Sequence, residues 1–370
     1  MLHRIGDIYA ERSERGAADM ELLSVTMNGG VMQRSEIEGK DNSSEDKSNY
    51  KVVRKGDMVY NSMRMWQGAN GVSPYDGIVS PAYTVLTAKL PICNEYFAAL
   101  FKNYKLINEF KKNSQGMTSD TWNLKYPQIK TIKVYLPRVT EQEKVASLLV
   151  TLDKRIAAQA TLVEQLKKYK RGLHKLVFIK NRKPSWEKSA LHDIASFCGG
   201  GTPSKDVSSY WDGEIGWISS SDIQEEWIDD ISVTRRITKK AIDNSATKLC
   251  PEGTIAIVSR VGVGKVAIIP ESLCTSQDFT NITSITGNTH YMAYQIAFRM
   301  KLEAMKTQGT SIKGVTADTI KSMVLDIPPL EEQKKIADML TAFDSYIKRA
   351  VYELNLFLTM KKALLQQLFI

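Results

Sequence analysis

Residues 129–178 read IKTIKVYLPRVTEQEKVASLLVTLDKRIAAQATLVEQLKKYKRGLHKLVF, and residues 320–369 read IKSMVLDIPPLEEQKKIADMLTAFDSYIKRAVYELNLFLTMKKALLQQLF. The two stretches align without a gap at a constant offset of 191 residues. Pro137 therefore matches Pro328, and Asp153 matches Asp344. A repeat of this kind defines the architecture of a chain, so we expect two copies of one structural unit.

The beginning of each copy predicts a short strand followed by a long helix. Alternating apolar residues end at a proline, which interrupts a sheet and suits the first turn of a helix. Acidic residues follow directly, at Glu141 and at Glu332, where the partial positive charge of a helix N-terminus favours them. We therefore expect one helix to begin after Pro137 and another to begin after Pro328. At 1.5 Å per residue, a helix of about 38 residues is roughly 57 Å long.

Apolar residues then recur at alternating steps of three and four, which is the a/d spacing of a coiled coil. The seam of the first copy is Leu149, Leu152, Ile156, Val163, Leu166 and Leu173. The seam of the second copy is Leu340, Phe343, Ile347, Leu354, Phe357 and Leu364. Lys170 and Lys361 share one seam position, where a polar residue can fix the register. We expect the helices to pair as an antiparallel coiled coil with pseudo-two-fold symmetry, although each could instead pack only on its own domain.

The pattern predicts an α+β chain made of four parts. We expect a β-rich first domain over residues 1–136 and a central helix with a basic linker over 137–183. A second β-rich domain should follow over residues 184–327, and a second long helix over 328–370. The chain has 370 residues, 43% hydrophobic and 25% charged, which suits a soluble protein with two cores.

Composition also argues against a membrane protein and against a metal protein. No apolar run approaches the length that spans a bilayer, and no signal peptide opens the sequence. The four cysteines are scattered and form no CxxC pair, so they do not predict a zinc site. We therefore expect no metal, and we expect a reducing, cytoplasmic setting.

The positive charge is concentrated in the central part of the chain. The net charge is +9, and residues 138–183 carry twelve basic and four acidic side chains. Such a stripe is typical of nucleic-acid binding, although a solvated helix face explains single lysines equally well. Residues 184–327 carry fourteen basic and seventeen acidic side chains. Any DNA reading by the second domain must therefore come from local loops.

In the first domain, two loops combine turn residues with side chains that read DNA. The segment 61–77 contains Arg64, Trp66 and Gln67, and arginine and glutamine recognise guanine and adenine edges. The tryptophan could stack on a base or simply anchor the loop. A second loop contains Ser114, Gln115, Gly116 and Thr118, and glycine there permits close backbone approach.

The second domain repeats these features in diverged form. Its candidate DNA-binding residues are Ser219, Ser220, Arg260, Lys265, Thr310, Ser311 and Lys313. The last three lie in a Gln-Gly loop that matches the one after Ser114, and either loop could instead be a turn that the fold needs. The segment Leu191–Ile194 echoes Ile5–Ile8. From that match we expect the first domain to lack a short lead-in strand, which puts in doubt whether it is complete.

Motifs of catalysis are not convincing in this sequence. Gly262-x-Gly264-x-x-Ala267 resembles a dinucleotide fingerprint, and Gly264-Lys265 resembles part of a P-loop. Both motifs require a helix after the glycines. A β-branched run ending at Pro270 follows instead, which predicts a hairpin. No Ser/His/Asp set or paired carboxylate motif stands out, so we expect no catalytic residues and no cofactor bound by this chain.

The chain resembles the specificity subunits of type I restriction-modification systems. The resemblance rests on two segments of the form PxxxEQxxIAxxLxxxDxxI, on Gly201-Thr202-Pro203-Ser204 and on the paired Gln-Gly loops. It implies two target-recognition domains that each read half of a bipartite double-stranded DNA sequence, with the helices setting the spacer between the halves. It further implies two modification subunits that bind S-adenosylmethionine and methylate adenine, and restriction subunits with translocase activity that join this complex.

A different class of function is also compatible with the sequence. The acidic second domain would suit a coiled-coil adaptor that carries two protein-binding modules and does not read DNA. A DNA-binding assay separates the two classes, because binding to DNA depends steeply on salt concentration. The target sequence and the spacer length do not follow from the residues.

Overall fold

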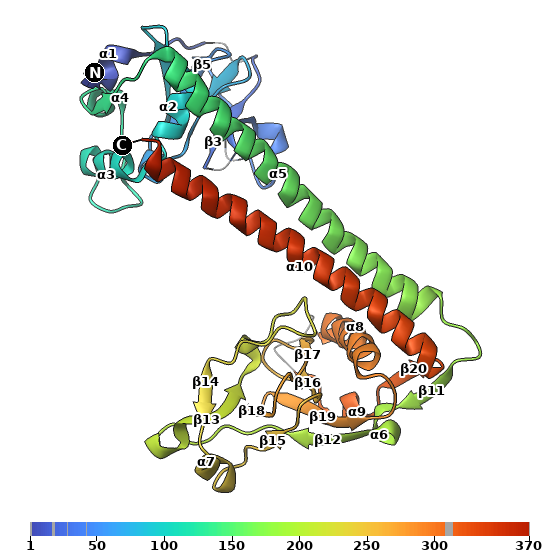
Figure 1. The fold of residues 1–370 in the computed structure, drawn as a ribbon. Coiled ribbons are helices and arrows are strands. Elements are labelled where there is room, and N and C mark those ends of the chain that lie inside the picture. Colours follow the sequence, from blue (N-terminus) through green and yellow to red (C-terminus); the bar gives the residue numbers. More distant parts are fainter. Residues whose placement is uncertain (1, 17–18, 28, 42, 308–313, 370) are drawn as a thin grey trace. The chain divides into compact units, whose positions relative to one another are not determined.

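A computed structural model of the chain describes residues 2–16, 19–27, 29–41, 43–307 and 314–369. It divides into two compact units, of which the first contains residues 1–161 and 351–370 and the second contains residues 162–350. Each unit combines small sheets, short helices and segments of two long helices (Figure 1). The α+β class predicted from the sequence is confirmed.

The first unit is organised around an antiparallel sheet with the strand order β2-β9-β6-β7. The pairs β1-β10, β3-β4 and β5-β8 form beside it. The strands are β1 (Leu2–Arg4), β2 (Tyr9–Glu11), β3 (Leu23–Thr26), β4 (Gly30–Gln33), β5 (Lys51–Val53), β6 (Met58–Asn61), β7 (Asn70–Val72), β8 (Gly77–Val79), β9 (Tyr83–Ala88) and β10 (Lys133–Tyr135). The short helices are α1 (Ile5–Ile8), α2 (Asn94–Leu100), α3 (Tyr104–Asn113) and α4 (Tyr126–Ile129), with 3-10 turns at Arg34–Glu36 and Met65–Gln67.

The second unit repeats this plan with the order β12-β19-β16-β17 and adds a second sheet, β14-β13-β18-β15. The pair β11-β20 stands beside them. The strands are β11 (Glu187–Ala190), β12 (Ala195–Gly199), β13 (Trp211–Ile218), β14 (Arg235–Ile237), β15 (Leu249–Cys250), β16 (Ile255–Val258), β17 (Val266–Ile268), β18 (Leu273–Thr275), β19 (Phe279–Ile285) and β20 (Val324–Ile327). The helices are α6 (Leu191–Ile194), α7 (Lys239–Asp243), α8 (Thr289–Thr307) and α9 (Ala317–Lys321), with 3-10 turns at Ser208–Tyr210 and Ser220–Asp222.

The expectation that the first domain lacks a lead-in strand was wrong. Strand β1 pairs with β10 in antiparallel register, with His3 opposite Val134. In the second unit β11 pairs with β20 in the same way. Strand β1 contains only three residues, too few to show an alternating pattern in the sequence.

The two copies of the repeat form the long helices α5 (Val139–Lys175) and α10 (Leu330–Gln367). A five-residue π-helical turn, Leu176–Lys180, extends α5. Both helices begin where the prolines predict. The twelve apolar seam residues are all buried or half-buried.

Within each unit, contacts between the long helices run in antiparallel order. In the first unit Lys361 Nζ lies 2.5 Å from Asp153 Oδ1, and about two turns further along Gln159 donates a hydrogen bond to Glu353. In the second unit Lys170 Nζ lies 2.7 Å from Asp344 Oδ1. The offset of 191 relates Lys170 to Lys361 and Asp153 to Asp344, so the two ion pairs are copies of each other.

The glutamine of each Glu-Gln pair has a structural role at the start of its long helix. Gln142 accepts a hydrogen bond from the backbone N–H of Cys93 and donates one to the carbonyl of Pro137, both at 2.9 Å. Gln333 makes the matching bonds to Asn288 and Pro328 at 2.8 Å. Both glutamines are buried. Each therefore fastens the start of a long helix to the helix that follows the main sheet.

The phenylalanine that closes each copy is buried in a core of its unit. Phe178 packs against Phe298 with ring centroids 5.6 Å apart, in a cluster that also holds Tyr291 and Leu340. Phe369 packs against Tyr96 at 5.2 Å. Burying one such side chain contributes about 1.5–3 kcal/mol, so both helix ends stabilise the cores they enter. Among the described residues, no helix is long and apolar enough to cross a membrane.

Candidate nucleic-acid interface

Equivalent hairpin loops occur in the main sheets of the two units. β6 and β7 pair in antiparallel register, as do β16 and β17, which confirms the hairpin predicted around Gly262-x-Gly264. Ser62 follows β6 and donates its backbone N–H to Ala82, while Ser259 follows β16 and donates to Asp278. The loops 62–69 and 259–265 therefore leave their sheets at the same point. We call them the first and the second hairpin loop.

The first hairpin loop lies against the Gln-Gly loop of its own domain. Trp66 contacts Trp122 in a T-shaped arrangement with ring centroids 5.2 Å apart. The backbone N–H of Leu124 donates to Ser62 at 2.8 Å, and the Nζ atom of Lys111 lies 5.8 Å from the Trp66 ring. The structure thus brings together the segments around Trp66 and Ser114. Lys111 and Trp122 were missed from the sequence because their proximity depends on a tertiary contact.

The Gln-Gly loop of the first domain is a tight, closed turn. Gln115 and Asn123 exchange two backbone hydrogen bonds at its base. Gly116 has a φ of 140°, and an added Cβ there would meet the Thr121 carbonyl oxygen at 2.6 Å. Only glycine fits this position. The turn holds Met117 fully exposed at its tip, and methionine is among the apolar side chains that wedge between base steps.

The candidate side chains of the first domain differ in how far they are already engaged. Ser114 donates its hydroxyl to the Phe110 carbonyl at 2.7 Å, and Thr118 contacts Thr121. Arg64 and Gln67 have no side-chain partner within the described part of the chain. The two side chains best suited to base edges are therefore the ones that the domain leaves available.

The second hairpin loop borders a groove of about 640 Å³. The groove is lined by Arg260, Gln277, Thr316, Lys321 and aromatic residues. Arg260 is exposed and, among the described residues, has no partner. Gly314 follows the second Gln-Gly loop, and an added Cβ there would lie 2.4 Å from the Ser259 carbonyl oxygen. The predicted residues Thr310, Ser311 and Lys313 lie outside the described residues.

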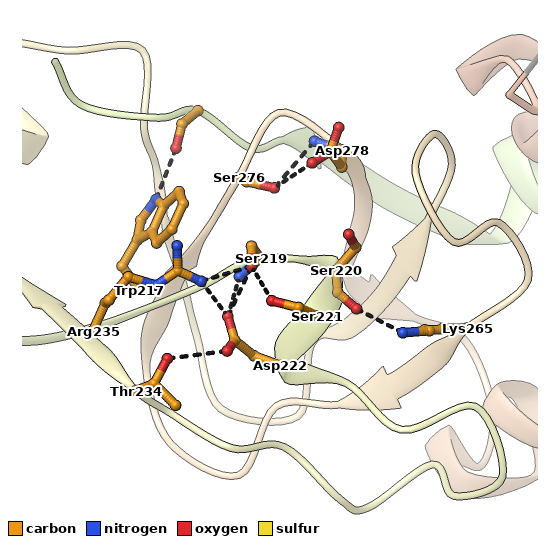
Figure 2. A network of polar contacts seen from close by, with 11 residues as sticks. Trp217, Ser219, Ser220, Ser221, Asp222, Thr234, Arg235, Lys265, Ser276 and Asp278 are labelled. Atoms are coloured by element: carbon orange, nitrogen blue, oxygen red, sulfur yellow. Dashed lines mark hydrogen bonds and ion pairs between the residues drawn. The ribbon is translucent and has the colours of Figure 1, made fainter. Parts of the chain in front are cut away.

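Ser219 belongs to a network that is already satisfied (Figure 2). Its hydroxyl donates to Asp222 at 2.9 Å, and Arg235 donates to the same carboxylate at 2.6 Å. Burial opposes ionisation of Asp222, but hydrogen bonds from Ser219, Arg235 and Thr234 outweigh it and lower the pKa of this carboxyl. The Arg235 guanidinium also lies 4.5 Å from the Trp217 ring. The network holds the end of β13 against β14.

Ser220 and Lys265 are brought together by the fold. Lys265 extends from the second hairpin loop and donates to the Ser220 carbonyl at 2.9 Å (Figure 2). This bond fixes the base of the loop and uses one of the three ammonium hydrogens of Lys265. Lys265 can therefore position the loop and also attract a phosphate.

The arrangement suits recognition of a nucleic acid better than chemistry on a small substrate. Each unit presents a hairpin loop whose arginine has no side-chain partner among the described residues, and in the first unit the Gln-Gly loop lies beside it. Within the described residues, no group of three or more His, Cys, Asp or Glu side chains is placed to hold a metal ion. Guanidinium and amide groups on rigid loops form the bidentate contacts that distinguish base pairs.

Comparison with known proteins gives one consistent result. The family model described as type I restriction modification DNA specificity domain matches residues 17–168 and again residues 184–355. The chain is 34% identical over 167 residues to the type I restriction enzyme MjaIX specificity subunit of Methanocaldococcus jannaschii, covering 44% of this chain and 39% of that protein. It is 30% identical over 246 residues to the EcoR124I/EcoR124II specificity subunit of Escherichia coli, covering 63% and 60%.

Solved structures show the same fold at lower sequence identity. The S subunit of a type I restriction-modification system from M. genitalium superimposes with a TM-score of 0.63. It is 13% identical, and the match covers all of this chain and 96% of that chain. The matches to the two relatives in sequence span about two fifths and three fifths of those proteins.

Proposed function

The chain belongs to the type I restriction modification DNA specificity domain family, and we propose that it recognises a bipartite DNA sequence. Residues 1–136 read one half-site and residues 184–327 read the other. The observation that carries this proposal is that both units place, on a hairpin loop, an arginine without a side-chain partner among the described residues. In the first unit this loop lies beside the Gln-Gly loop, and in the second unit Ser259 of the loop lies against Gly314, which follows the Gln-Gly segment in sequence.

The reading of bases is assigned to side chains that their domains leave available. In the first domain these are Arg64 and Gln67, with Trp66 anchoring the loop and Gln115 beside it. In the second domain they are Arg260 and Lys265, together with the predicted residues of the 310–313 segment. Phosphate contacts from backbone N–H groups and hydroxyls, including Ser220, fix the orientation of the loops on the duplex.

The long helices act as the spacer of the recognition complex. The apolar seam predicted along both helices and the two copied ion pairs support a rigid rod, because a polar residue at a seam position can specify register. The length of the rod then sets the number of unspecified base pairs between the half-sites.

The partners are those of a type I restriction-modification complex. Two modification subunits methylate adenine with S-adenosylmethionine, and restriction subunits join that complex. The chain itself is non-catalytic and supplies only recognition and assembly. It works in the cytoplasm, where it meets the DNA of the cell.

Exchange of one domain tests the proposal. The chain is expressed with its modification subunit, and methylated adenines are mapped across the host genome. Replacement of residues 1–136 by the first domain of another family member should change one half-site and leave the other half-site and the spacer intact. A change in both half-sites would show that the domains do not read independently. Absence of sequence-specific methylation with the native chain would contradict the proposed function.

The adaptor alternative draws on one observation, the excess of acidic side chains in residues 184–327. It predicts protein partners without DNA binding. The same mapping distinguishes the two, because an adaptor confers no sequence dependence on methylation.

A further inference from the structure

The C-terminal part of α5 carries cations that the repeat does not explain. Residues 162–183 contain eight lysines and arginines and one glutamate. Four of these cations are neutralised inside the second unit. The pairs are Lys167–Glu226, Lys170–Asp344, Arg182–Asp326 and Lys183–Glu332, with N···O distances of 2.6–3.1 Å.

Three of the remaining cations form a stripe on one face of α5. Lys168, Arg171 and Lys175 are spaced three and four residues apart, so their side chains are neighbours on the helix surface. All three are exposed and have no acidic partner within the described part of the chain. With Lys301 of α8 they line a groove of about 710 Å³. We call this feature the basic groove.

The groove keeps its positive charge because few groups oppose it. Glu226 is engaged by Lys167 at 3.0 Å. Among the described lining residues, Glu225 is the one carboxylate without a cation partner. His174 also lines the groove, and burial, together with repulsion from Lys170 and Lys301, lowers its pKa to about 3. It is therefore neutral near pH 7. Among the described lining residues, four cations without an acidic partner face one carboxylate without a cation partner.

The basic groove and the second hairpin loop lie on either side of the same helix. Lys301, Leu302 and Met305 of α8 line the groove. Gly264 of the second hairpin loop faces Ala304 and the backbone of Met300, with contacts of 3.7 Å to an added Cβ. The loop and the groove are thus separated by α8, and the diameter of a helix with its side chains is roughly 10 Å.

We propose that the basic groove binds phosphates of the DNA duplex whose bases the second hairpin loop reads. This inference rests on the proposed function and adds an anchor outside the base-reading loops. Exposed lysine and arginine side chains without fixed partners recognise charge rather than sequence. In this way the second domain, although acidic overall, has a local cationic site that can bind a polyanion. The phosphate backbone of DNA has the complementary charge.

The anchor belongs to one half of the molecule only. At the same repeat positions α10 carries Thr359, Lys362 and Gln366 in place of Lys168, Arg171 and Lys175. The stripe is therefore an addition to the duplicated helix and not a requirement of it. The second copy also shows which residues the helix accepts at two of these positions.

The test replaces the stripe and measures the salt dependence of DNA binding. The variant Lys168→Thr, Arg171→Gln, Lys175→Gln is assembled with the modification subunit. Binding is measured on a duplex with the mapped target and on a scrambled duplex. The slope of log K against log salt should fall by about 2–3, because each phosphate contact contributes about 0.9. Affinity for both duplexes should fall by the same factor.

A matched control removes three positive charges from exposed lysines elsewhere on α5 and α10. Lys144, Lys154 and Lys362 are also exposed and unpaired within the described residues, and their replacement by glutamine should leave the slope nearly unchanged. Lys168→Thr and Lys175→Gln, made singly, should each lower the slope by about one. These substitutions copy α10 and keep the test decisive if the triple variant folds poorly.

The possible outcomes separate the anchor from the proposed function. A slope equal to that of the control overturns the anchor. Loss of assembly of the triple variant with the modification subunit, with the single variants keeping the native slope, also overturns it, because the stripe would then be a protein interface. If the native complex does not distinguish target from scrambled DNA, the proposed function itself fails. If it does distinguish them and only the variant result is negative, the failure concerns the basic groove alone.

Discussion

An arginine at the tip of a hairpin finds few partners inside its own domain, and Arg64 and Arg260 illustrate this. Most arginines of the first unit are engaged: Arg12 pairs with Asp57 and Arg54 pairs with Glu14. Arg64 faces solvent beside an anchored tryptophan, so a DNA base can reach it without breaking an existing ion pair. The cost of desolvating the guanidinium is then offset by new hydrogen bonds to the base.

Arg64→Ala should weaken binding of the assembled complex to its target by about 1–3 kcal/mol and relax one position of one half-site. The other half-site should stay unchanged in a methylation map. Arg54→Ala is the matched control, because Arg54 is also exposed but lies in the turn at the opposite end of β6. Equal losses for the two variants would argue against base reading by the first hairpin loop.

Cys198 provides a probe of the second domain. Its Sγ lies 3.5 Å from Sγ of Cys250. The hydrogen bond from Cys250 outweighs burial and lowers the pKa of Cys198 to about 6. A lowered pKa means that the reactive thiolate forms above this value and is lost as the pH falls through it.

Alkylation of Cys198 by iodoacetamide should therefore rise through about pH 6 and level off near pH 7 in a rate profile followed by mass spectrometry. Cys250→Ala removes the hydrogen bond and should move the rise to higher pH. Cys93 serves as the internal control, because burial raises its pKa and it should react slowly at neutral pH. An unchanged profile in Cys250→Ala would contradict the assigned cause.

At the scale of the element, the duplicated helices contain one ion pair in two environments. The Lys170 and Asp344 side chains are 14% and 4% exposed, whereas those of Lys361 and Asp153 are 23% and 50% exposed. Burial raises the pKa of Asp344 against the attraction of Lys170. In the buried copy, the cost of removing both charges from water therefore largely cancels their attraction, so the ion pair contributes little net stability.

Asp344→Ala should destabilise the second unit by about 3–5 kcal/mol, because it leaves Lys170 buried without a counter-charge. Asp153→Ala should cost less than about 1 kcal/mol, because its partner remains accessible to water. Lys170→Met combined with Asp344→Leu should recover most of the loss. Chemical unfolding of the three variants measures the differences, and similar losses for the two aspartates would refute the distinction.

The repeat also explains which features of α5 and α10 could be predicted from the sequence. Spacing alone predicted where α5 and α10 begin and twelve apolar residues that are buried or half-buried along them, because both depend on neighbours in sequence. The role of Gln142 and Gln333 was not predicted, since their partners Cys93 and Asn288 lie about 45–50 residues earlier. Ser219 looked available for DNA for the same reason: its partner Arg235 reaches it only through the pairing of β13 with β14.

At the scale of the whole molecule, each long helix begins in one compact unit and ends in the other. The unit boundaries fall after Thr161 in α5 and after Ala350 in α10. They are therefore the places where the length of the proposed spacer can be changed without altering either recognition domain.

Insertion of seven residues at both boundaries preserves the a/d seam. It should lengthen the rod by about 10 Å, which corresponds to roughly three base pairs of B-DNA. Methylation mapping should then recover both original half-sites with a longer spacer. Insertion into α5 alone shifts the register and should abolish site-specific methylation. An unchanged spacer after the double insertion would exclude the helices as the element that sets it.

The burial of Phe369 against Tyr96 has a consequence for synthesis on the ribosome. The second unit is one continuous segment, whereas the first unit needs residues 351–369 to complete its core. A nascent chain that has released residues 1–161 still lacks that segment. We therefore expect the usual order of cotranslational folding, in which the N-terminal domain matures first, to be reversed. The core of the first unit is complete only after residues 351–369 have been synthesised.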